Sequence, residues 1–372
     1  MNEKQWAKEV WEKLDKKLSR TAVSSYDKIP YTTVDGVHDN RFENEPCWWT
    51  NGFWPALMVL MYAGTKKEQY LKTARHGMDI LDKALMNFDG LHHDVGFMWN
   101  ISSGTDYQIT GDLTERNRFL IAANHLMGRY NSNGEYIVAW NGEQNKGWAI
   151  IDCMMNIPLL YRASIELKDD RYAMIARNHA NKTMKYHVRE DGSCNHINEY
   201  NPLTGEFICD HGGQGYADGT SWSRGQSWAI YGYALSYRYT KDEAYLATAK
   251  KVANYFIANV QATDWTALCD FRQPEDSGLI DTTANAIAAC GMLEIAEHVP
   301  ENEKKMYHDA AVKLLAKAEE KYCDWSDEED SILQMGTEAH NFGGKHIPII
   351  YGDYFFAEGI YRLMGYDANI LW

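Results

Sequence analysis

The sequence predicts an all-α fold, in which about six helical hairpins close into an α/α barrel with long active-site loops at one end. Apolar helices alternate with more amphipathic ones along the chain, as inner and outer helices of such a barrel do. Near the start of the amphipathic helices, an aromatic residue is followed four positions later by Ala, so both face the same side of the helix. These pairs are Tyr70/Ala74, Phe119/Ala123, Tyr172/Ala176, Tyr245/Ala249 and Tyr307/Ala311.

The expected helices follow one another as hairpins. Apolar helices are expected over residues 51–63, 149–166, 226–238 and 282–296, and amphipathic helices over 68–87, 170–187, 243–260 and 302–322. The connections between hairpins are long, irregular and rich in Trp, Gly, His and Asp. An open solenoid has shorter connections and more uniform units, so these loops favour a closed barrel with a bowl at one end. Two short strands, over 194–200 and 206–210, are expected in that bowl.

Length and composition favour one domain and disfavour some partners. No low-complexity linker divides residues 1–372, so we expect a single barrel domain. The net charge of −15 argues against nucleic acid or an anionic membrane as the main partner. No apolar run approaches about 20 residues, and the start of the chain lacks a signal pattern, which predicts a soluble cytoplasmic protein. The seven cysteines are scattered without paired metal-type spacing, as expected of reduced thiols.

The aromatic content indicates a carbohydrate ligand. The chain has 13 Trp and 24 Tyr, and several of them lie in polar, Gly-rich segments, at residues 47–54, 139–142 and 220–228. Aromatic rings beside amides and hydroxyls suit pyranose rings, whose C–H faces stack while their hydroxyls form hydrogen bonds. We expect about half of the tryptophans in the core and the rest around a cleft.

Asp152 is the only ionisable carboxylate in the apolar run over residues 149–160. A carboxylate among Ile and Met side chains loses hydration, so its pKa is expected to rise toward neutrality, where a general acid/base works. The alternative is that Asp152 caps a helix that starts directly after it, because Asp commonly occupies that position. The sequence of this segment leaves both interpretations open.

Three connections together resemble the unsaturated glucuronyl hydrolases, family 88 of the glycoside hydrolases. They are residues 92–97 (His-His-Asp-Val-Gly-Phe), residues 147–160 around Asp152, and residues 218–232, which contain Ser-Trp-Ser-Arg-Gly-Gln-Ser-Trp. The resemblance extends from residues 49–54 to 351–354. It implies an (α/α)6 barrel without a metal or an organic cofactor. It also implies an anionic substrate, an oligosaccharide left by a polysaccharide lyase and ending in a 4,5-unsaturated uronic acid.

The resemblance assigns roles to individual residues. Asp152 is expected to deliver a proton to C4 of the double bond and then to act as base toward the water that adds at C5, and Asp94 to bind hydroxyls and orient the ring. Apart from the resemblance, the acidic net charge means that a local cation must offset the charge of the uronate, so Arg224 or Lys345, and Arg224 first, is expected to supply it. The alternative for Arg224 is an exposed arginine at a helix start. Lone histidines are more often structural, so a structural role remains the alternative for His93 and His196. The expected substrate contacts are Trp49, His93, Trp140, His196, Gln214, Arg224, Trp228 and Lys345.

The sequence is also compatible with other functions. Asn51 stands where some family members carry Asp, and residues 340–345 match only the final lysine of the pattern found in members that prefer sulfated sugars. The alternatives are an unsaturated rhamnogalacturonyl hydrolase, a glycosidase with an ordinary carboxylate pair, a sugar epimerase, or a barrel that binds carbohydrate without catalysis. The sequence does not indicate a protein partner.

Overall fold

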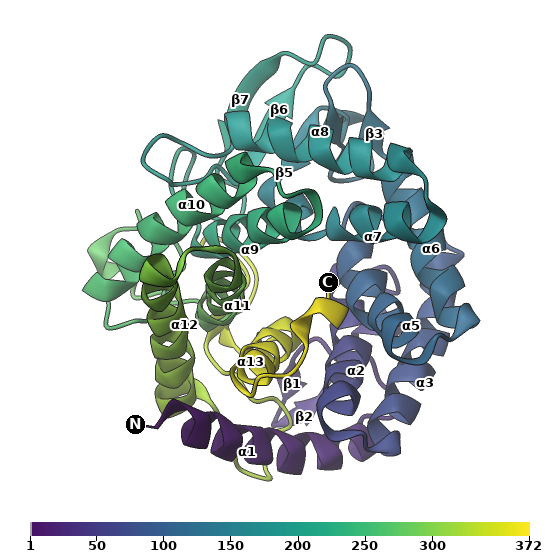
Figure 1. Ribbon diagram of the computed structural model, residues 1–372, viewed down its shortest axis with the longest axis vertical. Coiled ribbons are helices and arrows are strands. Elements are labelled where there is room, and N and C mark those ends of the chain that lie inside the picture. Colours follow the sequence, from purple (N-terminus) through teal and green to yellow (C-terminus); the bar gives the residue numbers. More distant parts are fainter. Residues whose placement is uncertain (1) are drawn as a thin grey trace.

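The computed structural model describes residues 2–372, which form a closed double ring of helices (Figure 1). The outer helices are α1 (Glu3–Ser24), α3 (Glu68–Leu85), α6 (Leu113–Gly128), α8 (Asp170–Tyr186), α10 (Glu243–Ala262) and α12 (Glu301–Tyr322). The inner ring consists of α2 (Phe53–Thr65), α4 (Val95–Trp99) with α5 (Thr105–Thr110), α7 (Pro158–Leu167), α9 (Ser223–Thr240), α11 (Thr282–His298) and α13 (Ile350–Leu363). The ring closes where α13 contacts both α1 and α2. The predicted (α/α)6 barrel is therefore confirmed.

The local sequence explains why these helices form and which way they face. In α11 every residue from Thr282 to Ala296 is buried, as expected of an inner helix, whereas the outer helices bury one face only. The five aromatic/Ala pairs lie on α3, α6, α8, α10 and α12, and all ten side chains are buried, so this part of the prediction is confirmed. Several helices begin at an aspartate whose side chain accepts a backbone N–H of the first turn: Asp112, Asp169, Asp242 and Asp281.

The prediction of one continuous helix over 149–166 is wrong. Residues Trp148–Ile150 form strand β5, a 3-10 turn follows at Ile151–Met155, and α7 starts only at Pro158. Residues 148–150 pair with a distant strand and so cannot be helical. Pro158 lacks the N–H that a continuing helix needs but fits the first turn, so the helix starts at Pro158. Strand β5 joins β6 (Ile197–Tyr200) and β7 (Phe207–His211) in an antiparallel sheet of order β5-β6-β7. The two strands expected in the bowl are confirmed.

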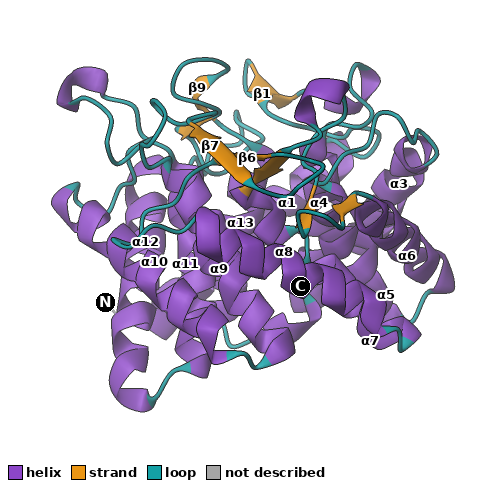
Figure 2. Cartoon of the chain, turned by 90° about the horizontal axis from the view of Figure 1, so that it is seen from above, coloured by secondary structure: helices purple, strands orange, loops and turns teal. Residues whose placement is uncertain are grey.

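The strands and long loops gather at one end of the helical ring (Figure 2). Besides the three-stranded sheet, this end carries three short antiparallel pairs: β1 (Thr33–Val34) with β2 (Val37–His38), β3 (Tyr130–Asn131) with β4 (Tyr136–Ile137), and β8 (Gly336–Thr337) with β9 (Lys345–Ile347). The helices below them share one hydrophobic cluster that runs from Trp6 to Trp372. Within residues 2–372, no helix combines the length and the apolar character that crossing a membrane requires.

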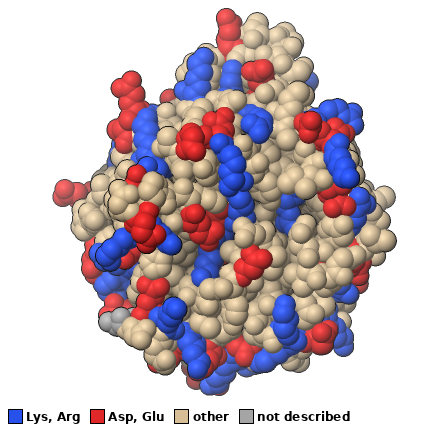
Figure 3. All heavy atoms as spheres, viewed as in Figure 1, with Lys and Arg blue, Asp and Glu red and all other residues tan. Residues whose placement is uncertain are grey.

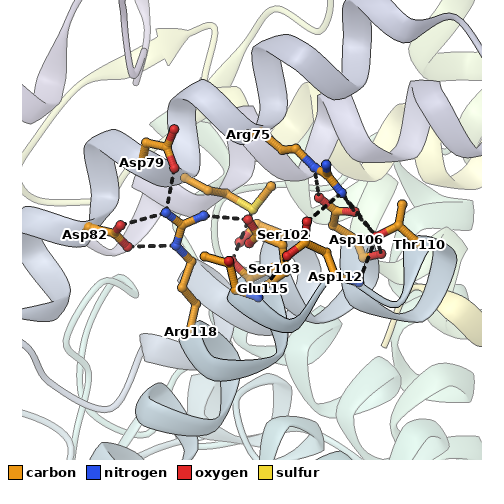
Figure 4. Close-up of polar contacts among 12 residues, drawn as sticks. Arg75, Asp79, Asp82, Ser102, Ser103, Asp106, Thr110, Asp112, Glu115 and Arg118 are labelled. Carbon is orange, nitrogen blue, oxygen red and sulfur yellow. Dashed lines mark hydrogen bonds and ion pairs between the residues drawn. The ribbon is translucent and has the colours of Figure 1, made fainter.

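Ion pairs join neighbouring helices, both within the outer ring and between the outer and inner rings (Figure 4). Arg118 of α6, which is 5% exposed, donates to Asp79 at 2.6 Å and holds Asp82 through two hydrogen bonds of 2.6 and 2.8 Å. Arg75 of α3 donates to both carboxylate oxygens of Asp106 in α5. Because the guanidinium forks are held at two points, they fix the orientation of neighbouring helices as well as their distance.

Charged side chains of both signs alternate over the face that Figure 3 shows, with no extended region of one sign. Nucleic-acid binding depends on clustered Lys and Arg that neutralise phosphates. This face does not offer such a cluster, in line with the acidic net charge of −15.

Asp353 provides a test of how burial couples the fold to pH. Its side chain is 1% exposed and accepts the backbone N–H groups of Ile332 at 3.0 Å and Leu333 at 2.6 Å. Burial outweighs these hydrogen bonds and raises the pKa of Asp353 to about 7. The folded state therefore keeps this proton at pH values where the unfolded chain has lost it, so the contribution to stability is complete below about pH 4 and is lost as the pH rises through about 7.

We expect the free energy of unfolding to fall by up to about 4 kcal/mol between pH 4 and 8 from this group. The fall should be absent in Asp353→Asn, which cannot ionise, and retained in Asp327→Asn, whose side chain is exposed. Urea unfolding at several pH values measures it. Parallel pH profiles for the wild type and Asp353→Asn would contradict the assignment.

Candidate active site

A cavity of about 450 Å³ opens at the loop end of the barrel. Its size lies within the range of small-molecule sites. Its wall combines aromatic rings with two carboxylates, two imidazoles and an amide: Trp48, Trp49, His92, Asp94, Trp140, Trp148, Ile150, Asp152, His196, Ile197, Gly213, Gln214 and Phe342. Such a mixture allows sugar rings to stack while their hydroxyls form hydrogen bonds.

Asp152 lies on the 3-10 turn that follows β5, and it is 7% exposed. Its Oδ2 is 3.5 Å from Nε2 of His196 and has no hydrogen-bond partner within the protein. The helix-cap interpretation is excluded, because α7 starts at Pro158 and its cap residue is Ile157. A buried carboxylate oxygen without a partner, at a cavity wall, is available to a ligand.

The hydrogen-bond pattern of His196 determines where its proton lies. The backbone N–H of Gln214 donates to Nδ1 at 3.0 Å, so the neutral ring carries its hydrogen on Nε2, which faces Asp152. Gly213 makes this contact possible, because it has φ +57° and a Cβ at this position would collide with Nδ1 of His196. The ring is thus held as a hydrogen-bond donor toward the cavity.

Asp94 is surrounded by donors. Its carboxylate oxygens lie 3.3 Å from Nδ1 of His92 and 3.3 Å from Nε2 of His93, and Oδ1 accepts a 2.9 Å hydrogen bond from Asn156. Burial alone would raise the pKa of Asp94, but the two imidazoles outweigh burial and hold this pKa well below its ordinary value. Asp94 is therefore ionised at neutral pH.

Asn156 links the segments that carry the two carboxylates. Its Nδ2 donates to Asp94 and, at 3.3 Å, to the backbone carbonyl of Asp152, while its Oδ1 accepts the N–H of Phe97 at 2.9 Å. Gly96 allows the close approach, since a Cβ there would be 2.6 Å from Cα of Asn156. Asn156 is not among the predicted site residues, although an amide four residues after Asp152 in an apolar run is a detectable signal.

Six of the predicted site residues lie together on the cavity wall: Asp94, Asp152, Trp49, Trp140, His196 and Gln214. The prediction that His93 contacts the substrate is wrong, because its ring is 0% exposed and lies behind Asp94, and His92 takes the place on the wall. The same prediction is wrong for Trp228, whose ring is also 0% exposed and packs against Phe97 at 5.0 Å in the core.

Arg224 has the predicted interactions, but with protein groups. It is 1% exposed, pairs with Asp281, donates to the carbonyls of Thr337 and Glu338, and lies over the ring of Trp222 at 4.5 Å. With both terminal nitrogens engaged, it fixes the 336–347 loop. The prediction of direct substrate contact is therefore wrong for Arg224.

Lys345 does not lie on the cavity wall either. Its side chain is exposed on β9, within the 336–347 segment that Arg224 holds. No Lys or Arg is present among the described residues that line the cavity, so the expected positive charge is missing there. Seven wall residues were not among the predicted site residues: Trp48, His92, Trp148, Ile150, Ile197, Gly213 and Phe342. Trp48 and His92 directly precede residues that were predicted, and Phe342 is 57% exposed.

Two groups of three residues within 2–372 bring potential metal ligands together. One is His92, His93 and Asp94 at the cavity, and the other is Glu199, Cys209 and His211 on the sheet. The first group already has the hydrogen-bonding role described above.

An α/α barrel whose loop end holds a pocket of aromatic rings, carboxylates and imidazoles defines a carbohydrate-active enzyme. The family model of Glycosyl Hydrolase Family 88 matches residues 20–322. The chain belongs to this family of glycosidases.

Individual relatives agree with the family. The chain is 35% identical over 348 residues to an unsaturated glucuronyl hydrolase of Bacillus sp. (strain GL1), with 91% of each chain covered. It is 34% identical over 349 residues to an unsaturated chondroitin disaccharide hydrolase of Streptococcus pneumoniae, covering 91% of this chain and 87% of the relative. Among solved structures, a UGL variant with dGlcA-Glc-Rha-Glc superposes with a TM-score of 0.90 at 32% identity, covering 96% of each chain.

Proposed function

We propose that this chain is an unsaturated glucuronyl hydrolase that hydrates the C4=C5 double bond of a terminal 4,5-unsaturated uronic acid in lyase-generated oligosaccharides of the glycosaminoglycan type. The family match over residues 20–322 carries this proposal. It is supported by the cavity, where Asp152 has an oxygen free for a ligand and Asp94 is held ionised. The cytoplasmic location expected from the sequence stays a prediction.

One carboxyl group suffices for both proton transfers. Asp152 in its protonated form gives its proton to C4, which leaves an oxocarbenium-like C5, and the carboxylate then takes a proton from the water that adds at C5. The resulting hemiketal opens to a ketone at C5. C1 is then a hemiacetal, which collapses to an aldehyde and releases the aglycone sugar as an alcohol. One water is consumed, and Asp152 ends protonated as it began.

The neighbours of Asp152 orient the ring and the water. His196 presents Nε2–H beside Asp152 and can donate to a hydroxyl or to the attacking water. Asp94, being ionised, accepts hydrogen bonds from ring hydroxyls, and its position is set by Asn156. Trp49 and Trp140 are suited to stacking on the two sugars.

The outer part of the cavity favours a neutral aglycone. Trp140 also lines an adjoining cavity of about 620 Å³, in which Lys146 is paired with Glu143 at 2.7 Å. Arg129, in the same cavity, donates to the carbonyl groups of Val138 and Ala139. Because the described residues that line the catalytic cavity include several aromatic rings but no Lys or Arg, sugars without sulfate should be preferred.

The ultraviolet absorbance of the conjugated double bond tests the reaction directly. We expect this absorbance to decrease with time when the enzyme is mixed with an unsulfated unsaturated chondroitin or hyaluronan disaccharide. The decrease should be slower with the 6-sulfated chondroitin disaccharide. In heavy-oxygen water, early product should carry the label at C5 and none on the released sugar.

Attack at the anomeric carbon of the uronate predicts a different initial product, which retains the double bond and its absorbance. An initial product that still absorbs would overturn the hydration mechanism. Unsaturated rhamnogalacturonan products, offered in the same assay, measure how far the activity extends beyond glycosaminoglycan disaccharides. Binding without any change in absorbance would show a non-catalytic barrel.

A further inference from the structure

Three potential metal ligands share one face of the sheet next to the active site. Glu199 of β6 is directly opposite Cys209 of β7, and His211 follows Cys209 by two residues. Side chains two apart on a strand and directly opposite on its neighbour project from the same face, so the three converge above the sheet. The side chains of Glu199, Cys209 and His211 are all partly exposed, so this face is accessible.

The distances between the ligand atoms are close to those of a tetrahedral zinc site. Sγ of Cys209 is 3.6 Å from Nε2 of His211 and 3.8 Å from Oε2 of Glu199, and Nε2 is 2.8 Å from Oε2. Zinc–ligand bonds of about 2.3 Å to sulfur and 2.0–2.1 Å to nitrogen or oxygen place such atoms about 3.6 Å and 3.3 Å apart. Opening the Glu199–His211 contact by about half an ångström completes the geometry.

We propose that Glu199, Cys209 and His211 bind a divalent cation of the zinc class, with water as the fourth ligand. A thiolate, an imidazole and a carboxylate suit Zn²⁺ or Co²⁺, whereas Mg²⁺ and Ca²⁺ prefer oxygen ligands only. The side chains of Glu199 and His211 are about one-third exposed, so an ion can enter and a water can complete the coordination.

The proposed ion lies next to the wall of the catalytic cavity. The ring of His211 stacks on Trp148 with centroids 4.9 Å apart and an interplanar angle of 28°. Trp148 lines the cavity and contacts Trp140 at 5.9 Å. An ion that fixes His211 therefore restricts the aromatic wall on the side of the aglycone.

Titration with Co²⁺ alone tests the site, because a thiolate bound to cobalt gives an intense near-ultraviolet absorption that other ligands do not. We expect one cobalt per chain, with the band removed on adding Zn²⁺. Cys209→Ala should abolish the band, and His211→Gln and Glu199→Gln should weaken affinity at least about tenfold. Cys47→Ser removes a thiol outside the cluster and should leave the band intact, as should Asp94→Asn, which alters the other group of potential ligands.

A second measurement needs no substitution in the cluster. Zn²⁺ should protect Cys209 of the wild-type protein from alkylation, detected by peptide mass spectrometry, while Cys47 stays as reactive as before. Absence of the cobalt band in the wild type, or equal alkylation of Cys209 with and without zinc, would overturn the proposal. So would a band of unchanged intensity in Cys209→Ala.

Discussion

Replacing Asp152 with Asn should lower kcat on unsaturated disaccharides by about 10²–10⁴-fold, the usual contribution of a general acid/base. Asparagine keeps the shape of the side chain but cannot release and recover the proton that the reaction needs. The fold should be unaffected, because Oδ2 of Asp152 has no hydrogen-bond partner within the protein to lose. KM should change little, since binding depends on the rest of the cavity.

Loss of the ultraviolet chromophore measures the rate, and circular dichroism measures the fold. Asp353→Asn serves as the matched control, because it also removes a buried carboxyl but lies outside the residues that line the cavity. It should retain the wild-type rate. Near wild-type turnover by Asp152→Asn, with an unchanged spectrum, would show that another group transfers the proton.

The barrel itself could be predicted because its signals are local. A Tyr and an Ala four residues apart, as in Tyr70 and Ala74, share a face of one helix whatever the rest of the chain does. The break in the predicted helix 149–166 could not be found in this way. It depends on β5 pairing with β6, about fifty residues further along the chain, and distant pairing overrides local preference.

The sequence predicted which residue types form the site better than it predicted which side chains face the cavity. His92 and His93 are adjacent and chemically identical, and only the folded chain decides which faces the cavity. The backbone N–H of His93 donates to the carbonyl of Ala139 at 3.1 Å, and its ring is buried behind Asp94. No pattern within the segment 92–97 contains that information.

Arg224 illustrates a different limit. Its position between two tryptophans correctly suggested stacking and carboxylate pairing, but Asp281, its partner, is 57 residues away in the sequence. A sequence motif can indicate that an arginine stacks on an aromatic ring and pairs with a carboxylate. It does not show whether that carboxylate belongs to a ligand or to the protein. In this fold the arginine holds the loop from which Phe342 reaches the cavity.

Replacing Asp94 with Asn should lower kcat/KM by about 10–150-fold for each hydrogen bond lost to the ionised carboxylate, or about 1.5–3 kcal/mol. Unlike Asp152→Asn, this change should raise KM as well as lower kcat, because Asp94 is expected to hold ring hydroxyls before the reaction and to hold them more strongly in the transition state. Asn156→Ala is the companion variant: it leaves the Asp94 charge in place but removes the 2.9 Å hydrogen bond that positions it.

The pH dependence separates charge from position. Because the pKa of Asp94 lies well below its ordinary value, its ionisation should not appear in the profile of kcat/KM above pH 4. The shape of the wild-type profile over this range should therefore be retained in Asp94→Asn, at a lower level. Disappearance of the alkaline limb in Asp94→Asn would mean that this carboxyl, rather than Asp152, supplies the catalytic proton. A merely structural role for Asp94 predicts instead that Asp94→Asn lowers the melting temperature and leaves kcat/KM of the folded fraction unchanged.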